Sequence, residues 1–201
     1  MFSIEESVKY SWHKAKEHME ISLFATLLVL AVSILTNKSL LGLIATIFLI
    51  IIKIGYTKIF LRIHDGESPK FVEIFEEYRI FWRYLGTSIL TFLTIIGGLI
   101  LLIIPGIFWA VRFSFSPIVV IDTKLGPVAS MKESWAITKG QFWKILGFWV
   151  VIGLFNLAGL IVFGIGLLVT VPVSTLASIY VYRELSRIKA GLIQTASPQA
   201  A

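Results

Sequence analysis

The chain has no cysteine. A framework of disulfide bonds is therefore excluded, and so is a metal site built from thiolates. The same absence leaves open whether the protein works in an oxidising or a reducing compartment.

Charged residues are also scarce, at 15% of the 201 residues, against about 25% in an ordinary soluble domain. Hydrophobic residues make up 57% of the chain, and the mean hydropathy is +0.87. This composition is not that of a soluble globular domain. It indicates a protein whose surroundings are largely lipid.

The N-terminal segment has no signal-peptide pattern. A signal peptide needs an uninterrupted apolar core followed by a cleavage site. The first twenty residues instead carry charged side chains at Glu5, Glu6, Lys9, Lys14, Lys16, Glu17 and Glu20. We therefore expect this segment to remain in the mature protein.

Six apolar runs approach the length of about 20 residues with which a helix crosses a bilayer core of roughly 30 Å. They lie near residues 20–37, 40–61, 85–104, 106–122, 144–162 and 165–183. The sequence thus predicts an all-α integral membrane protein, with residues 1–184 as a single six-span domain. Residues 185–201 are expected to form a short, disordered cytoplasmic tail.

The distribution of lysine and arginine predicts the topology. Sixteen of these residues lie in the N-terminal segment or around the ends of the second, fourth and sixth runs, whereas the other connections hold Lys38 alone. Because cytoplasmic loops carry the excess of positive charge, we expect both termini in the cytoplasm and the protein in the cell (inner) membrane. Lys53 and Lys58, near the end of the second run, are interpreted as reaching the headgroups along the lipid.

Two short phrases recur along the chain. The residues Ser7, Lys9, Ser11, Trp12 and Lys16 reappear 123 positions later as Ser130, Lys132, Ser134, Trp135 and Lys139. The phrase FWRYLG at 81–86 reappears as FWKILG at 142–147. These repeats predict three quasi-repeated units at about 1–62, 63–124 and 125–184, each an interfacial amphipathic helix followed by a transmembrane hairpin.

The stretch 126–143 is typical of a helix lying in the membrane interface. Its apolar residues recur at spacings of three and four, whereas lysine, glutamate and glutamine occupy the opposite face. The candidate interface anchors are Trp12, Lys16, Trp82, Trp135, Lys139 and Lys144. These residues could hold anionic lipid headgroups, or they could simply anchor the helices at the bilayer surface.

Residues 101–148 carry a specific combination of features. Pro105–Gly106 is expected to close a hairpin, Arg112 lies in the next run, and Asp122 and Gly126–Pro127 precede the phrase Ser-Trp-x-x-Thr-Lys-Gly at 134–140. This stretch resembles the membrane-domain family named after glycerophosphoryl diester phosphodiesterase, which is related to bacterial inner-membrane families of uncharacterised function. In some relatives such a domain is fused to a soluble phosphodiesterase domain. Nothing in this chain corresponds to that soluble domain, so the resemblance implies a membrane domain and not a hydrolase.

No catalytic, cofactor or metal site is predicted. The three histidines lack metal-ligand spacing, and the HExxH, GxSxG and P-loop patterns are absent. An intramembrane lipid enzyme, the least favoured alternative, would need His64, Asp65 and Asp122 to converge. A nucleic-acid partner is not supported, because the basic residues flank the apolar runs and form no separate stripe.

Arg112 is a charged residue inside the fourth apolar run. Its depth is about 9 Å if the run starts at Gly106, where a charge costs at least ~2.5 kcal/mol without partners. Asn156 reaches a similar depth in the fifth run. One hypothesis is that Arg112, Asn156 and backbone carbonyls freed at Pro105 form a polar cluster. Such a cluster could only fix helix packing, and Arg112 could instead reach outward to a phosphate.

The sequence favours a non-enzymatic membrane scaffold that organises lipid or a partner, which would be a separate soluble enzyme or another membrane protein. The alternative is a transporter or channel for a small solute or a lipid. A cavity reaching Arg112 and Asn156 would favour transport. A solid bundle with the amphipathic helices on its surface would favour the scaffold.

Overall fold

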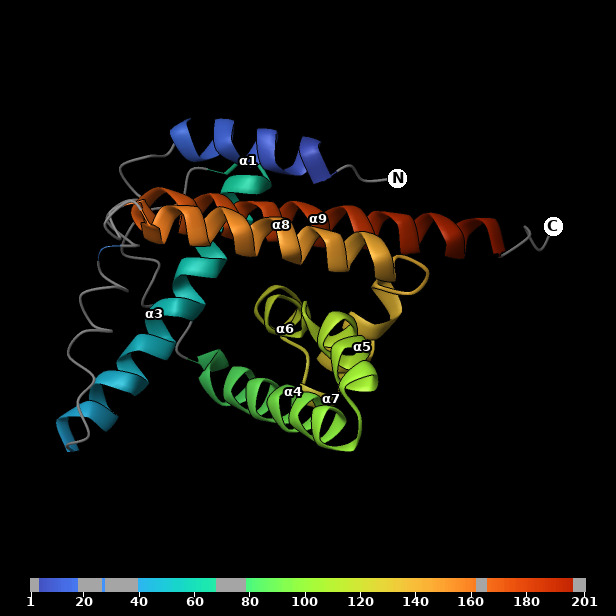
Figure 1. Ribbon diagram of the computed structural model, residues 1–201, viewed down its shortest axis with the longest axis horizontal. Helices are drawn as coiled ribbons and strands as arrows, with labels where there is room; N and C mark the ends of the chain where they lie inside the picture. The colour runs from blue at the N-terminus through green and yellow to red at the C-terminus, as the bar shows by residue number, and fades with distance from the viewer. Residues whose placement is uncertain (1–3, 18–26, 28–39, 68–78, 162–165, 197–201) are drawn as a thin grey trace.

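The computed structural model describes residues 4–17, 27, 40–67, 79–161 and 166–196. All regular structure in these residues is helical. The helices are α1 (Ile4–Glu17), α3 (Leu40–His64), α4 (Phe81–Leu101), α5 (Ile103–Phe113), α6 (Ser116–Thr123), α7 (Pro127–Ile137), α8 (Phe142–Ile161) and α9 (Leu167–Ala196) (Figure 1).

Three of the described helical segments are long and apolar enough to cross a membrane. They are α4, the segment Ile103–Thr123 that comprises α5 and α6, and α8. They coincide with the third, fourth and fifth predicted runs, and α3 and α9 occupy the second and sixth. The first predicted run lies outside the described residues except for Leu27. The helical membrane class is therefore supported, whereas six spans and three repeated units stay predictions.

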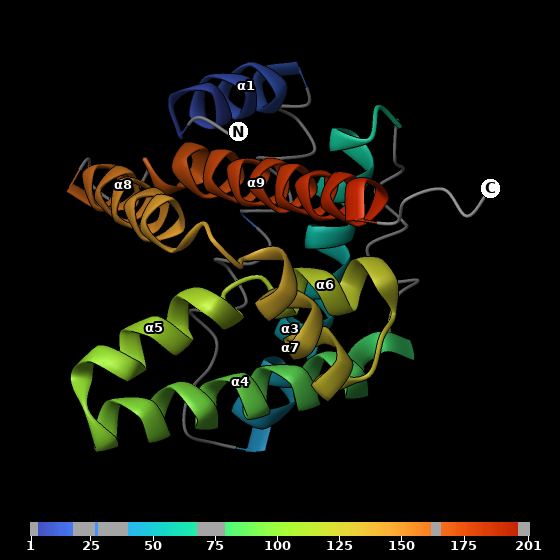
Figure 2. The same ribbon diagram turned by 90° about the vertical axis from the view of Figure 1, so that its right-hand side faces the viewer.

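The helices form a stack in which α1 is outermost and packs on α9 (Figures 1 and 2). Below α1, α8 and α9 lie side by side. On the opposite side α4 and α5 form a hairpin, and α6 and α7 pack against α4. The core holds fully buried side chains from different elements, including Phe60 of α3, Phe115 just before α6 and Phe148 of α8.

The hairpin between α4 and α5 turns at Leu102 rather than at Pro105–Gly106. The backbone of Leu102 is extended, with φ −164 and ψ 142, and its N–H donates to the carbonyl of Gly98 at 3.0 Å. Pro105 instead lies in the first turn of α5. A proline fits there because the first N–H groups of a helix have no partner within the helix.

The fourth predicted run is two helices rather than one. Helix α5 ends at Phe113 and α6 begins at Ser116, with Pro117 in its first turn. Pro117 therefore begins a new helix rather than kinking a continuous span. Pro172 lies inside α9 without ending it, and α9 continues as helix to Ala196 where we had expected a disordered tail.

The first recurring phrase is buried in the same way in α1 and α7. All four of its serines are fully buried, namely Ser7, Ser11, Ser130 and Ser134. The tryptophan that follows the second serine, Trp12 or Trp135, is exposed in both helices. The serines therefore face the protein in both helices, and the tryptophan lies on the outward side together with charged residues, Lys9 in α1 and Lys132 in α7.

The second recurring phrase also has the same local structure at both sites. It begins a helix at Phe81 and again at Phe142. The second residue is exposed in both copies, at 76% for Trp82 and 79% for Trp143. In each copy the Phe and Trp rings meet edge to face, with their centroids 5.3 Å apart.

Candidate functional site

A charged cluster joins the ends of α3 and α6 to α9. The guanidinium of Arg183 donates to both carboxylate oxygens of Asp122, at 2.8 and 3.0 Å, and to Asp65 at 2.6 Å. The hydroxyl of Tyr182 donates to Asp122 at 2.8 Å. The cluster therefore gathers, at one place, three of the segments that we expected on the cytoplasmic side.

The residues of the enzyme alternative only partly converge. Asp65 and Asp122 meet, but both carboxylates accept hydrogen bonds from Arg183, so neither is free to act as a base. The ring of His64 instead packs on Tyr10 and Tyr180, with centroids 5.4 and 5.9 Å away. Burial lowers the pKa of the His64 imidazole, against an opposing effect of the Asp65 carboxylate. The part of the chain that the structure describes holds no group of three side chains suited to a metal ion.

Arg112 lies between α5 and α7. Its guanidinium carbon is 5.0 Å from the centroid of the Phe108 ring and 5.1 Å from that of Trp135. Its backbone carbonyl accepts a hydrogen bond of 2.8 Å from the Ser134 hydroxyl. Its Nε and Nη1 atoms are buried and have no hydrogen-bond partner in the described part of the chain. Two aromatic rings, whose faces attract cations, thus lie against a guanidinium that still has unused hydrogen-bond donors.

Asn156 lies in different surroundings, between α8 and α9. Its Nδ2 donates to the Ser174 hydroxyl at 2.9 Å and to the Ile152 carbonyl at 3.0 Å. The expected cluster of Arg112, Asn156 and Pro105 is therefore not assembled. The two side chains have different neighbours, because Arg112 of α5 packs on Trp135 of α7, whereas Asn156 of α8 donates to Ser174 of α9.

A groove runs beside the aromatic pair that holds Arg112. It has a volume of about 400 Å³ and lies between α4, the end of α5 and α7. We call it the α4–α7 groove, and it is lined by Leu90, Thr94, Phe113, Val128, Met131, Lys132 and Trp135. Its walls are mostly apolar and its one cationic side chain is Lys132, which is the pattern of a site for an amphipathic molecule.

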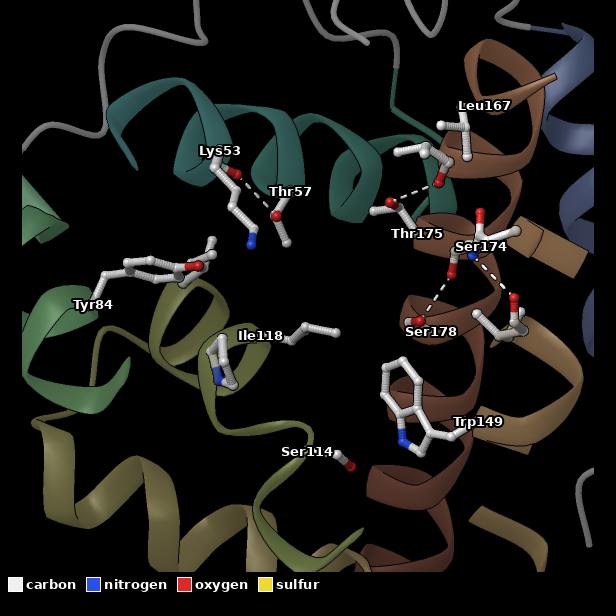
Figure 3. Close-up of a pocket in the computed structure, with 15 residues that line it drawn as sticks. Lys53, Thr57, Tyr84, Ser114, Ile118, Trp149, Leu167, Ser174, Thr175 and Ser178 are labelled. Atoms are coloured by element: carbon white, nitrogen blue, oxygen red, sulfur yellow. Dashed lines mark hydrogen bonds between the residues drawn. The ribbon is translucent and has the colours of Figure 1, made fainter. Parts of the chain in front are cut away.

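A second hollow, which we call the central cavity, lies between α3, α4, α6, α8 and α9 (Figure 3). Its volume of about 460 Å³ falls within the range of roughly 300–1,000 Å³ that is usual for small-molecule sites. Its polar lining residues are Lys53, Thr57, Tyr84, Ser114, Trp149, Asn156, Ser174, Thr175 and Ser178.

Several polar groups of the central cavity have no partner among the residues that the structure describes. Lys53 makes no ion pair within the described residues, and the hydroxyl of Tyr84 makes no hydrogen bond there. The Nε1 atom of Trp149 and the Oδ1 atom of Asn156 are buried without a partner. Figure 3 shows Lys53 and Tyr84 pointing into the same space. The sequence analysis assigned Lys53 to the lipid surface and missed it as a site residue.

One signal could have identified Lys53. It stands eleven residues before His64, the last residue of α3, and therefore about 16 Å from that end of the helix at 1.5 Å per residue. A lysine this far from the helix end can serve a site within the bundle as well as the headgroups.

The candidate interface anchors are spread over several elements. Trp12, Trp82 and Trp135 are exposed on α1, α4 and α7. Lys139 is exposed in the turn after α7, and Lys144 is half-buried on α8. The side chain of Lys16 lies outside the described residues. The exposure of the three tryptophans is compatible with contact to a bilayer surface.

Comparison of the chain with protein-family models, curated proteins and solved structures gave no match. The resemblance of residues 101–148 to the membrane-domain family therefore stays a prediction. A function can be inferred only from the contacts and hollows described above.

Proposed function

We propose that this protein is a multi-pass membrane protein that binds and organises anionic lipid through the α4–α7 groove. The observation that carries the proposal is the outward apolar side of α7, where Val128 is 57% exposed and Trp135 is exposed beside Lys132. In a soluble protein these apolar side chains would lie in water, whereas a helix in the bilayer interface buries them in lipid.

The groove matches the two parts of a lipid molecule. An acyl chain would lie along Leu90, Phe113 and Met131, and the phosphate would lie near the ammonium of Lys132. A basic residue near the bilayer surface contributes about 1 kcal/mol to the binding of anionic lipid. Arg112 supports this arrangement because its guanidinium packs on Trp135 and so fixes one wall of the groove.

The proposed topology places the ends of α3, α6 and α9 in the cytoplasm, together with both termini. The shared cluster around Arg183 supports this placement, because the three segments can meet only on the same side of a bilayer. Among the partners expected from the sequence, the two hollows favour lipid over a separate soluble enzyme or another membrane protein.

The lipid proposal is tested by the lipid that copurifies with the protein from mixed phosphatidylcholine and phosphatidylglycerol membranes. Wild type should retain phosphatidylglycerol above its share of the membrane. Lys132→Gln should reduce that enrichment about fivefold, since ~1 kcal/mol is lost. The matched control Lys139→Gln removes an exposed lysine outside the groove and should change it less than twofold. Retention of both lipids in the membrane ratio, or equal effects of the two variants, would overturn the proposal.

A second candidate function, transport of a small solute, is favoured by the polar lining of the central cavity. Transport requires that the cavity opens to each side of the membrane in turn. A Ser174→Cys variant would carry the sole cysteine of the chain. Its thiol should react with a membrane-impermeant maleimide from either side. Reaction from one side only would exclude transport through this cavity.

A further inference from the structure

We propose that the central cavity is a binding site for an anionic group, a phosphate or a carboxylate, held by Lys53. This inference goes beyond lipid binding at the α4–α7 groove and depends on different residues. It concerns binding alone and holds whether or not the bound molecule then crosses the membrane.

The first argument is charge. Lys53 lies about 16 Å from the end of α3, and it forms no ion pair with any residue that the structure describes. The residues lining the cavity include no aspartate and no glutamate. Lys53 is exposed to this hollow, and a cation without a counter-charge attracts an anion. Since these walls supply none, an anion in the cavity would supply it.

The lining of the cavity has more unused hydrogen-bond donors than unused acceptors. The hydroxyls of Thr57, Ser178 and Thr175 donate to backbone carbonyls one turn earlier, so their protons are already used. Free donors remain at the ammonium of Lys53, the hydroxyl of Tyr84 and the indole N–H of Trp149. One buried acceptor, Oδ1 of Asn156, has no partner. The surplus of free donors matches a group that carries several acceptor oxygens.

The unused donors lie around a common space. The free donors come from three helices: Lys53 from α3, Tyr84 from α4 and Trp149 from α8. Figure 3 shows these side chains around a common space, with Ser174 of α9 on the same wall as Trp149. A volume of about 460 Å³ exceeds the size of a phosphate ion and leaves room for an organic remainder. The apolar wall formed by Ile118, Leu167 and Val171 would contact that remainder.

The test uses the full chain in nanodiscs of phosphatidylcholine, titrated with inorganic phosphate at constant ionic strength and followed by calorimetry. A parallel arm measures the enrichment of phosphatidylglycerol around the protein in mixed nanodiscs. We expect saturable binding in at least one arm. Lys53→Gln should weaken it at least tenfold, because the cation is lost. Trp149→Phe should weaken it about threefold while keeping an aromatic ring.

The matched control is Lys58→Gln, which removes the same charge from α3 at a position that does not line the cavity. It should leave binding within twofold of wild type, and Lys132→Gln should do the same for phosphate. Binding of phosphate alone identifies a free anion as the ligand, and enrichment of lipid alone identifies a headgroup. Absence of both, or an equal loss in Lys53→Gln and Lys58→Gln, overturns the proposal. If Lys53→Gln does not fold, unchanged binding in Trp149→Phe overturns it.

A failure at this site leaves the α4–α7 groove untouched, because no residue lines both hollows. Loss of lipid enrichment in Lys132→Gln alone would support the groove, and the phosphate arm would then decide for or against the cavity. Loss in Lys53→Gln alone would support the cavity and contradict the groove.

Discussion

Arg183 holds the carboxylate of Asp122 through two hydrogen bonds, at 2.8 and 3.0 Å. The two residues stand 61 positions apart, which is also the shift that superposes FWRYLG on FWKILG. If the chain consists of repeated units, Asp122 and Arg183 occupy matching positions at the ends of the second and third.

Arg183→Leu should destabilise the protein by about 2–4 kcal/mol. Removal of one partner from a largely buried pair leaves the other charge without compensation, and here Asp122 and Asp65 both lose their cation. The measurement is the free energy of unfolding in mixed micelles. Arg187→Leu is the control, because Arg187 is exposed and lies 3.8 Å from Glu184. Such exposed pairs contribute about 0–1 kcal/mol, and a similar loss in both variants would contradict the central role of Arg183.

Gly98→Ala should disrupt the α4–α5 hairpin, whereas Gly97→Ala should not. A Cβ at Gly98 would lie 2.6 Å from the Trp109 ring and 2.9 Å from the Cα of Gly106, whereas a Cβ at Gly97 meets nothing within 4 Å. Overpacking of this kind costs roughly 1–3 kcal/mol. Thermal unfolding of the two variants measures the difference. A higher stability of Gly98→Ala than of Gly97→Ala would show that the two helices are further apart than described.

Ser134→Leu should detach α7 from the bundle more strongly than Ser134→Ala does. Alanine removes only the hydrogen bond to the Arg112 carbonyl, worth about 1 kcal/mol. Leucine also has to fit at a position that is fully buried. The control Val128→Leu changes the outward side of the same helix and should have little effect. Protection of the α7 amides from hydrogen exchange measures docking, and equal protection in all three variants would contradict the inward serine side.

Stability should fall as the pH drops below about 6.5, the ordinary pKa of histidine. Burial lowers the pKa of His64 in the folded state, so the unfolded chain binds the proton first and folding is penalised. The penalty grows until the pH has passed through the lowered pKa, and it is absent at neutral pH. His64→Phe keeps an aromatic ring against Tyr10 and should flatten this part of the profile. A pH profile of unfolding that is the same for wild type and His64→Phe would exclude this cause.

Composition and periodicity predicted the helical membrane class and the positions of α4 and α8. These features depend on local patterns. The turn at Leu102 was missed because proline tolerates the first turn of a helix as well as the end of one. The break between Phe113 and Ser116 was missed because average hydropathy does not change across so short a break.

The candidate sites were harder to predict. The position of a residue along a helix sets its depth in the membrane, but it does not set which neighbour the side chain faces. Arg112 and Asn156 have similar predicted depths but face different neighbours. Lys53, which is exposed, lines the central cavity. The helical tail needed a contact distant in sequence, since Lys189 of α9 donates to both carboxylate oxygens of Glu133 in α7 at 2.7 Å.

The most direct measurement labels single cysteines in a chain that has none of its own. Glu67→Cys and Lys124→Cys follow the ends of α3 and α6, and Leu102→Cys lies at the exposed turn between α4 and α5. In intact cells, a membrane-impermeant maleimide should label Leu102→Cys at once and the other two only after permeabilisation. Labelling of all three from outside, or labelling that is the same before and after permeabilisation, would contradict a chain that crosses the bilayer with these ends in the cytoplasm.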